Sequence, residues 1–136
     1  MHRITRKEPV VIHGMNHFTI TAENREATLA FYSGVLGLQQ GDRPDLGFSG
    51  AWLYAEGNPQ AVLHIYWDRP MPASRTGVID HMAFTASGPK AVKERLDAAG
   101  IAYQLRQQVG SGTWQLFSTD PNGARVELDF DAGESA

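Results

Sequence analysis

The chain has 136 residues, a length suited to one compact domain with its own hydrophobic core. Its 42% hydrophobic and 20% charged residues argue against wholesale disorder, and its net charge of −3 argues against a basic, nucleic-acid-binding face. The absence of cysteine excludes disulfides and thiolate metal ligands, and agrees with a cytoplasmic location. We expect neither a signal peptide nor a membrane-spanning helix, because no sufficiently long apolar run is present.

The first half of the chain predicts a strand, a helix and three further strands, after an N-terminal arm expected at residues 1–14. Alternating β-branched and aromatic residues predict the strand at residues 15–22. Apolar residues at one-face spacing after Asn24 predict a helix that stops at Gly37. The remaining strands are predicted at residues 38–40, 48–55 and 61–67.

After a proline-containing linker at residues 68–77, the pattern starts again and extends to residue 130, leaving a tail at 131–136. A strand is predicted at 78–86, followed by a helix with Ser87 as its cap and Gly100 just beyond its end. Three more strands are predicted at residues 102–106, 113–119 and 124–130. The expected fold is therefore α+β, with two βαβββ modules at 15–67 and 78–130 forming one domain.

Direct alignment of the two halves supports the repeat. The segment NHFTITA, which contains His17, aligns without gaps with DHMAFTA, which contains His81. Near the other end of each half, His64 aligns with Glu127. Two positions that can bind a metal therefore recur at nearly the same place in each module.

Strand periodicity places these four residues on corresponding faces, because side chains alternate between the two faces of a sheet. Each curved sheet would offer two ligand-type residues from its concave face, and a pseudo-two-fold axis between the modules would make all four converge. Three imidazoles and one carboxylate suit Zn, Ni, Fe(II) or Mn, and suit Ca²⁺ or Mg²⁺ poorly. The same periodicity puts Thr19 on the face of His17 and Tyr66 on the face of His64, and we expect a substrate pocket there. Two further aromatic residues could wall such a pocket, so the candidate substrate-binding residues are Thr19, Tyr66, Trp52 and Trp114.

The motifs NHFTITAENREATLAFYSGVLGL, VLHIY, IDHMAF and LFSTDPNGARVELDF resemble those of the vicinal oxygen chelate superfamily, which includes glyoxalases, bleomycin resistance proteins and extradiol dioxygenases. The resemblance extends from about residue 15 to residue 130. It implies two βαβββ modules with a metal cleft on the concave face, usually in a homodimer. It also implies that one divalent ion is bound by His17, His64, His81 and Glu127.

The activity implied first is that of a glyoxalase I-like lyase or isomerase, with Glu127 as metal ligand and general base acting on a small oxygen-chelating substrate. Glutathione is not indicated, because Thr21 stands where such enzymes use an arginine to bind it. An extradiol dioxygenase would use His17, His81 and Glu127 for Fe(II). It ranks second, because Phe117 replaces the family's tyrosine and no histidine lies between Ala83 and Glu127.

Two further readings of the resemblance remain. A fosfomycin-type thiol transferase would also use Thr19, but the sequence has no counterpart of its cation-binding loop. A ligand-binding protein of the bleomycin-resistance type would not need a metal, and the four intact ligand-type residues argue against it.

Overall fold

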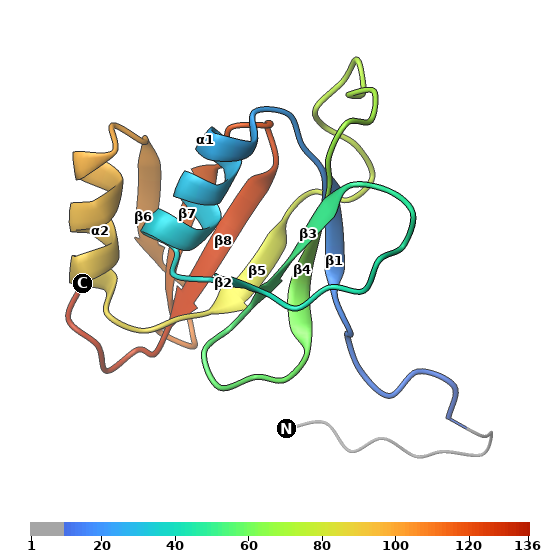
Figure 1. Ribbon diagram of the computed structural model, residues 1–136. Coiled ribbons are helices and arrows are strands. Elements are labelled where there is room, and N and C mark those ends of the chain that lie inside the picture. Colours follow the sequence, from blue (N-terminus) through green and yellow to red (C-terminus); the bar gives the residue numbers. More distant parts are fainter. Residues whose placement is uncertain (1–9) are drawn as a thin grey trace.

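The computed structural model describes residues 10–136 and confirms the α+β class, with two tandem modules that each contain a four-stranded mixed sheet (Figure 1). The first module contains β1 (Phe18–Thr21), α1 (Arg25–Leu29), η1 (Ala30–Val35), β2 (Gln39–Gly41), β3 (Gly50–Tyr54) and β4 (Ala61–Tyr66). The second contains β5 (Met82–Thr85), α2 (Pro89–Ala98), β6 (Tyr103–Gln107), β7 (Trp114–Thr119) and β8 (Arg125–Phe130). In residues 10–136, no helix has the length and apolarity needed to cross a bilayer.

The first helix begins where the sequence predicts. The Asn24 side chain accepts a hydrogen bond from the amide of Ala27 and so caps the amino terminus of α1. The helix then widens into the π-helical segment η1 and ends before Gly37, whose φ of 81° suits a glycine. Capping and termination thus both come from local sequence.

The cap predicted for the second helix is wrong. Gly88 occupies the cap position with a φ of 72°, and Pro89 follows it as the first helical residue. Ser87 therefore stands one residue too early to cap this helix. The Gly88 amide instead donates to the carboxylate of Glu134, 2.9 Å away.

The two sheets have the same topology, in the orders β1-β4-β3-β2 and β5-β8-β7-β6. In each sheet the first strand is an edge strand that pairs in parallel with the fourth. The pairing of β5 with β8 begins at Met82, which explains why the strand predicted at 78–86 is shorter in the structure. Val78 and Ile79 have no strand partner there and are exposed, at 104% and 67%.

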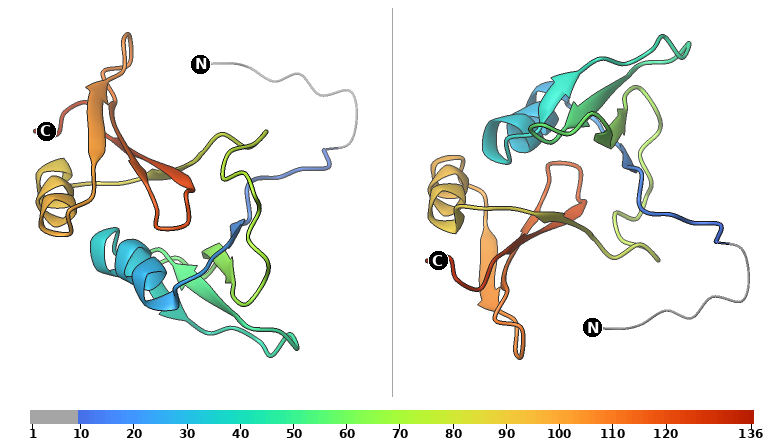
Figure 2. Two further views of the ribbon diagram at one scale, coloured as in Figure 1. Left: turned by 90° about the horizontal axis from the view of Figure 1, so that it is seen from above. Right: turned by 90° about the horizontal axis from the view of Figure 1, so that it is seen from below.

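One face of each sheet packs under the helices, and a single hydrophobic core spans both modules. The buried residues of the first sheet alternate with half-buried ones, as Leu63 and Ile65 do with His64 and Tyr66. The helices α1 and α2 lie on the same side of the molecule (Figure 2), and Arg95 of α2 donates to the carbonyl of Val35. The opposite face of each sheet is left free for other contacts.

Candidate metal centre

In the first sheet, strand register places His64 in a row with Thr19 on one side and Trp52 on the other. The His64 ring is stacked between the His17 ring, with centroids 3.6 Å apart, and the Trp52 ring, with centroids 4.3 Å apart. Its Nε2 atom is buried and has no hydrogen-bond partner in the part of the chain that the structure describes. An unsatisfied buried nitrogen is costly in a folded protein and indicates a missing partner.

In the second sheet, the equivalent row contains Ala83, Glu127 and Phe117. The Nε2 atom of His81 lies 2.9 Å from Oε1 of Glu127. The other carboxylate oxygen of Glu127 accepts a hydrogen bond of 3.1 Å from the Gln115 side chain. Glu127 is almost completely buried, so these contacts determine the orientation of its carboxylate.

The residue preceding each of the two edge-strand histidines orients its ring. Nδ1 of His17 lies 2.6 Å from the Asn16 side-chain oxygen, and Nδ1 of His81 lies 2.6 Å from a carboxylate oxygen of Asp80. Because both oxygens are acceptors, each Nδ1 carries the proton. Nε2 is then the atom through which each ring can bind a metal. Hydrogen bonds from Nδ1 to a neighbouring oxygen commonly orient metal-binding histidines in this way.

The electrostatics favour the neutral form of the His64 imidazole in the first sheet and the ionised form of the Glu127 carboxylate in the second. Burial lowers the pKa of His64, and the neighbouring His17 and Arg43 lower it further. Burial raises the pKa of Glu127, but hydrogen bonds with Asp129 and Gln115 and the charge of His81 outweigh it, so the net shift is downward. Burial, with the hydrogen bond and charge of Glu127, raises the pKa of Asp129 to about 6.

The four predicted ligands form two pairs rather than one cluster. His17 and His64 are in contact in the first module, as are His81 and Glu127 in the second. Within residues 10–136, no three histidine or acidic side chains come close enough to bind one ion. The two edge-strand histidines do line a common cavity of about 360 Å³, together with Met15, Asn16, Phe18, Val62, Met82, Ala83 and Phe84.

Three of the four predicted substrate-binding residues lie on the face that carries His64. Thr19 and Trp52 share its row, and Tyr66 lies one row further along. The structure does not bring Trp114 to the ligand-bearing face of its own sheet. It pairs with the buried Phe130 and packs against the hydrophobic core.

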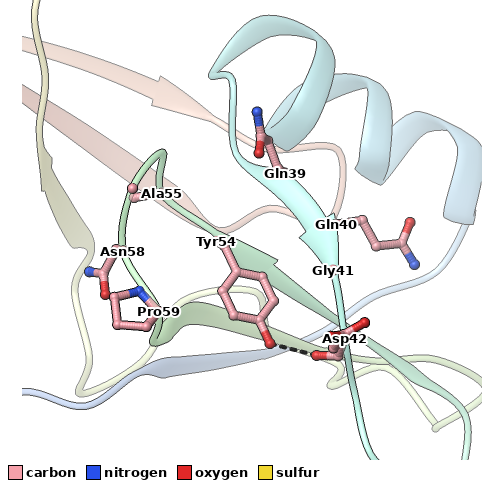
Figure 3. A pocket seen from close by; sticks show the side chains of 9 residues that line it. Gln39, Gln40, Gly41, Asp42, Tyr54, Ala55, Asn58 and Pro59 are labelled. Atoms are coloured by element: carbon pink, nitrogen blue, oxygen red, sulfur yellow. Dashed lines mark hydrogen bonds between the residues drawn. The ribbon is translucent and has the colours of Figure 1, made fainter.

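A hollow larger than the cavity lined by His17 and His81 lies away from these pairs. It has a volume of about 600 Å³ and is lined by residues of β2, β3 and the turn that follows β3, including Gln39, Tyr54 and Pro59 (Figure 3). The Tyr54 hydroxyl donates to the carbonyl of Asp42, which also lines this hollow. None of the four ligand-type residues lines this hollow, so cavity size does not identify the site.

Sequence reasoning missed three residues of the site: Asn16, Asp80 and Gln115. The signal for the first two was present, since each begins one of the aligned segments NHFTITA and DHMAFTA. Gln115 had no such signal. It reaches Glu127 only because β7 pairs with β8.

Comparison with known proteins assigns the family. The sequence profile of the Glyoxalase/Bleomycin resistance protein/Dioxygenase superfamily matches residues 14–128, which include all four candidate ligands. The chain belongs to this superfamily. No curated protein sequence matches it.

Several solved structures of the glyoxalase fold are similar to the chain. A protein of Bacillus anthracis named for the glyoxalase family is 22% identical, with 91% of this chain and 99% of that chain covered and a TM-score of 0.72. The glyoxalase family protein from Enterococcus faecalis is 26% identical, with 86% and 97% covered and a TM-score of 0.61. The fosfomycin resistance protein FosX from Listeria monocytogenes is 19% identical, with 88% and 94% covered and a TM-score of 0.68. A variant of that FosX has been crystallised with Mn(II) and 1S,2S-dihydroxypropylphosphonic acid.

Proposed function

We propose that this glyoxalase-superfamily chain is a metal-dependent lyase or isomerase of the glyoxalase I type, acting on a small substrate that chelates through neighbouring oxygens. One divalent ion would be held by His17, His64, His81 and Glu127. The observation that carries the proposal is the matched orientation of His17 and His81. In each module a side-chain oxygen 2.6 Å from Nδ1 leaves Nε2 as the atom for metal binding.

The residues present fit a divalent metal. Nε2 of His64 is buried without a hydrogen-bond partner among the described residues, and Glu127 offers a buried carboxylate beside Nε2 of His81. Imidazole and carboxylate donors suit Zn, Ni, Fe(II) or Mn. A bound ion would act as a Lewis acid and stabilise negative charge on the substrate oxygens. The Mn(II) bound to the FosX variant supports the fit of such an ion to this fold.

In this proposal Glu127 is both ligand and general base. Gln115 holds one carboxylate oxygen, while the other lies beside His81. A carboxylate held in this way can accept a proton from a carbon next to a substrate carbonyl and return it to the neighbouring carbon. Thr19, Trp52 and Tyr66 would form the wall against which the substrate lies.

We propose further that the centre is completed in a homodimer. Each chain provides two separate pairs of ligands, and no group of three forms within residues 10–136. The face of the first sheet leaves Trp52, His64 and Tyr66 only half-buried, which suits a surface that another chain covers. A dimer that apposes the first sheet of one chain with the second sheet of its partner would bring two histidines and the His81–Glu127 pair together.

Metal content tests the proposal most directly. Tag-free protein purified without chelator should contain about one equivalent of Zn, Ni, Fe or Mn per site, as measured by elemental mass spectrometry. The His81→Ala variant should lose this metal, because both the imidazole and its contact with Glu127 are removed. A wild-type protein that neither contains metal nor takes it up on titration would contradict the proposal and favour a metal-free ligand-binding protein.

The identity of the metal directs the assay. If the metal is nickel or zinc, 2-oxoaldehyde–thiol adducts are the substrates to test. If it is iron, catechols are the substrates to test, with oxygen uptake as the measurement. The Glu127→Gln variant should keep part of the metal but lose turnover by about 10²–10⁴-fold, the usual contribution of a general base. Full activity in that variant would remove Glu127 from the mechanism.

Light scattering over a range of protein concentrations tests the homodimer. We expect the mass of two chains, and a concentration-independent monomer that still binds one equivalent of metal would contradict a shared centre.

A further inference from the structure

The ligand-bearing face of the first sheet carries two arginines whose charge no carboxylate balances. Arg43 precedes β3 and Arg69 follows β4, and neither forms an ion pair with any acidic residue in the described part of the chain. Arg25, Arg75 and Arg125 do form such pairs with acidic side chains. Arg95 and Arg106 form no ion pair among the described residues either, so what distinguishes Arg43 and Arg69 is that two unpaired guanidinium groups lie together against one aromatic ring.

Both guanidinium groups are held against the same aromatic ring. Their carbon atoms lie 5.1 Å (Arg43) and 4.9 Å (Arg69) from the centre of the Phe48 ring. Arg69 also lies 3.9 Å from the centre of the Tyr66 ring, which meets Phe48 edge to face at 5.4 Å. Arg43 is held further by donation to the Phe48 carbonyl at 3.0 Å. Stacking holds both groups in place, and the hydrogen bond adds to it for Arg43, which reduces the entropy lost when they bind a ligand.

The position of Gly50 shows that the sheet makes room for Arg43. A side chain at Gly50 would place its Cβ only 2.8 Å from the Arg43 guanidinium, so Arg43 lies directly over this residue. Gly50 is the register partner of Tyr66, and Trp52 is the register partner of His64. The arginine pair thus lies one row along the strands from the proposed ligand His64, a separation of roughly 7 Å.

We propose that Arg43 and Arg69 bind an oxyanion at the far end of the substrate, so that the substrate is a small chelating acid. The substrate's neighbouring oxygens would lie at the metal row and its carboxylate or phosphonate group at the arginine row. This inference rests on the proposed metal-dependent function. The planar guanidinium group matches both kinds of oxyanion through paired hydrogen bonds, and gives no such advantage to a neutral group.

The similar arrangement in the second sheet is less suited to this role. Phe117 lies between Arg106 and Arg125, at 4.8 and 4.6 Å from the guanidinium carbons. Arg125, however, is in contact with Asp80 at 3.4 Å, so an acidic side chain already balances part of the charge there. The first sheet therefore offers the stronger oxyanion site.

Calorimetric titration of metal-depleted and metal-loaded protein tests the assignment without a known reaction. The probes are glutarate and 3-phosphonopropionate as the two kinds of oxyanion, and glutaramide as a neutral analogue of glutarate. Wild-type protein should bind at least one acid about tenfold or more tightly than the diamide, with affinity that falls as salt is added. Arg43→Gln and Arg69→Gln should each weaken acid binding about tenfold and leave diamide binding unchanged.

The matched control removes two positive charges elsewhere. Lys90 and Lys93 lie on α2, and the Lys90→Gln/Lys93→Gln variant should bind the acids as the wild type does. Thermal unfolding should show that each arginine variant is folded. Equal binding of acids and diamide by the wild type, or unchanged discrimination in the Arg43→Gln/Arg69→Gln variant, would overturn the oxyanion site.

Metal content separates this result from the proposed function. If the metal is present but discrimination does not depend on the arginines, the inference fails and the metalloenzyme proposal stands. If discrimination depends on the arginines but no metal binds, the metalloenzyme proposal fails and the oxyanion site stands.

Discussion

At the scale of single residues, the repeated chemistry lies as much in the neighbours of the histidines as in the histidines themselves. Asn16 and Asp80 occupy equivalent positions and each holds Nδ1 of the following histidine at 2.6 Å. Only Asp80 carries a charge, so the two modules orient their histidines by the same geometry but with acceptors of different strength. The carboxylate is the stronger acceptor and should hold the His81 ring more firmly in the orientation that metal binding needs.

Removal of the Asp80 carboxylate should therefore weaken metal binding without removing a ligand. Asp80→Ala should lower the affinity for the metal about 10–100-fold, the usual effect of losing such an outer contact. Competition with a chromogenic chelator would measure the change. Glu94→Ala, which removes an exposed carboxylate from α2, should leave the affinity unchanged, and equal affinity in both variants would show that Asp80 has no orienting role.

At the scale of secondary structure elements, the pairing of β3 with β4 places Trp52 against His64 and brings the backbone of β4 close to Gly50. A Cβ atom at Gly50 would lie 2.5 Å from the carbonyl of Ile65 as well as close to Arg43. Backbone cannot move aside as a flexible side chain can. Glycine is thus required here for the close approach of two strands.

Gly50→Ala should accordingly destabilise the protein by about 1–3 kcal/mol, the range typical of an overpacked site. The free energy of unfolding in urea would measure this cost. Gly34→Ala is the matched control, since a Cβ atom at Gly34 meets nothing within 4 Å. It should be neutral or slightly stabilising. A Gly50→Ala variant as stable as the control would mean that the two strands separate easily.

At the scale of the whole molecule, buried polar contacts connect the modules across the shared core. The Tyr32 hydroxyl of η1 donates to the carboxylate of Asp120, 2.5 Å away in the turn before β8. In the same turn, the Asn122 side chain donates to the hydroxyl of Thr28. Burial and the charge and hydrogen bond of Asp120 all raise the pKa of Tyr32, so the hydroxyl stays a neutral donor. The two modules should therefore unfold together.

Tyr32→Phe should lower the free energy of unfolding by about 1–3 kcal/mol, because it leaves a buried carboxylate oxygen without its donor. Tyr103→Phe is the control, since its hydroxyl makes only a long contact of 3.4 Å with an exposed carboxylate. That change should stay within about 0.5 kcal/mol. Urea unfolding followed by both tryptophan fluorescence and circular dichroism should give one coincident transition, and two transitions would show independent modules.

Local sequence patterns were sufficient for the element order and for the faces of the strands. Alternation along 61–67 correctly separates the buried Leu63 and Ile65 from His64 and Tyr66, because the side-chain period of a strand does not depend on its neighbours. The residue at which β5 begins was not predictable in the same way, because Val78 and Ile79 were expected in this strand and lie outside it. Their apolar character resembles that of a strand, but pairing begins only where β8 provides a partner.

The sequence by itself determined the superfamily, the two-module fold and the four candidate ligands, since motifs and repeats are properties of the chain alone. Only the tertiary structure decided that these ligands lie in two pairs, that Gln115 supports Glu127 and that Trp114 lies on the opposite face from it. Each of these depends on which strands are neighbours and on how the modules pack. Such contacts join residues far apart in the chain, where no local pattern records the distance between them.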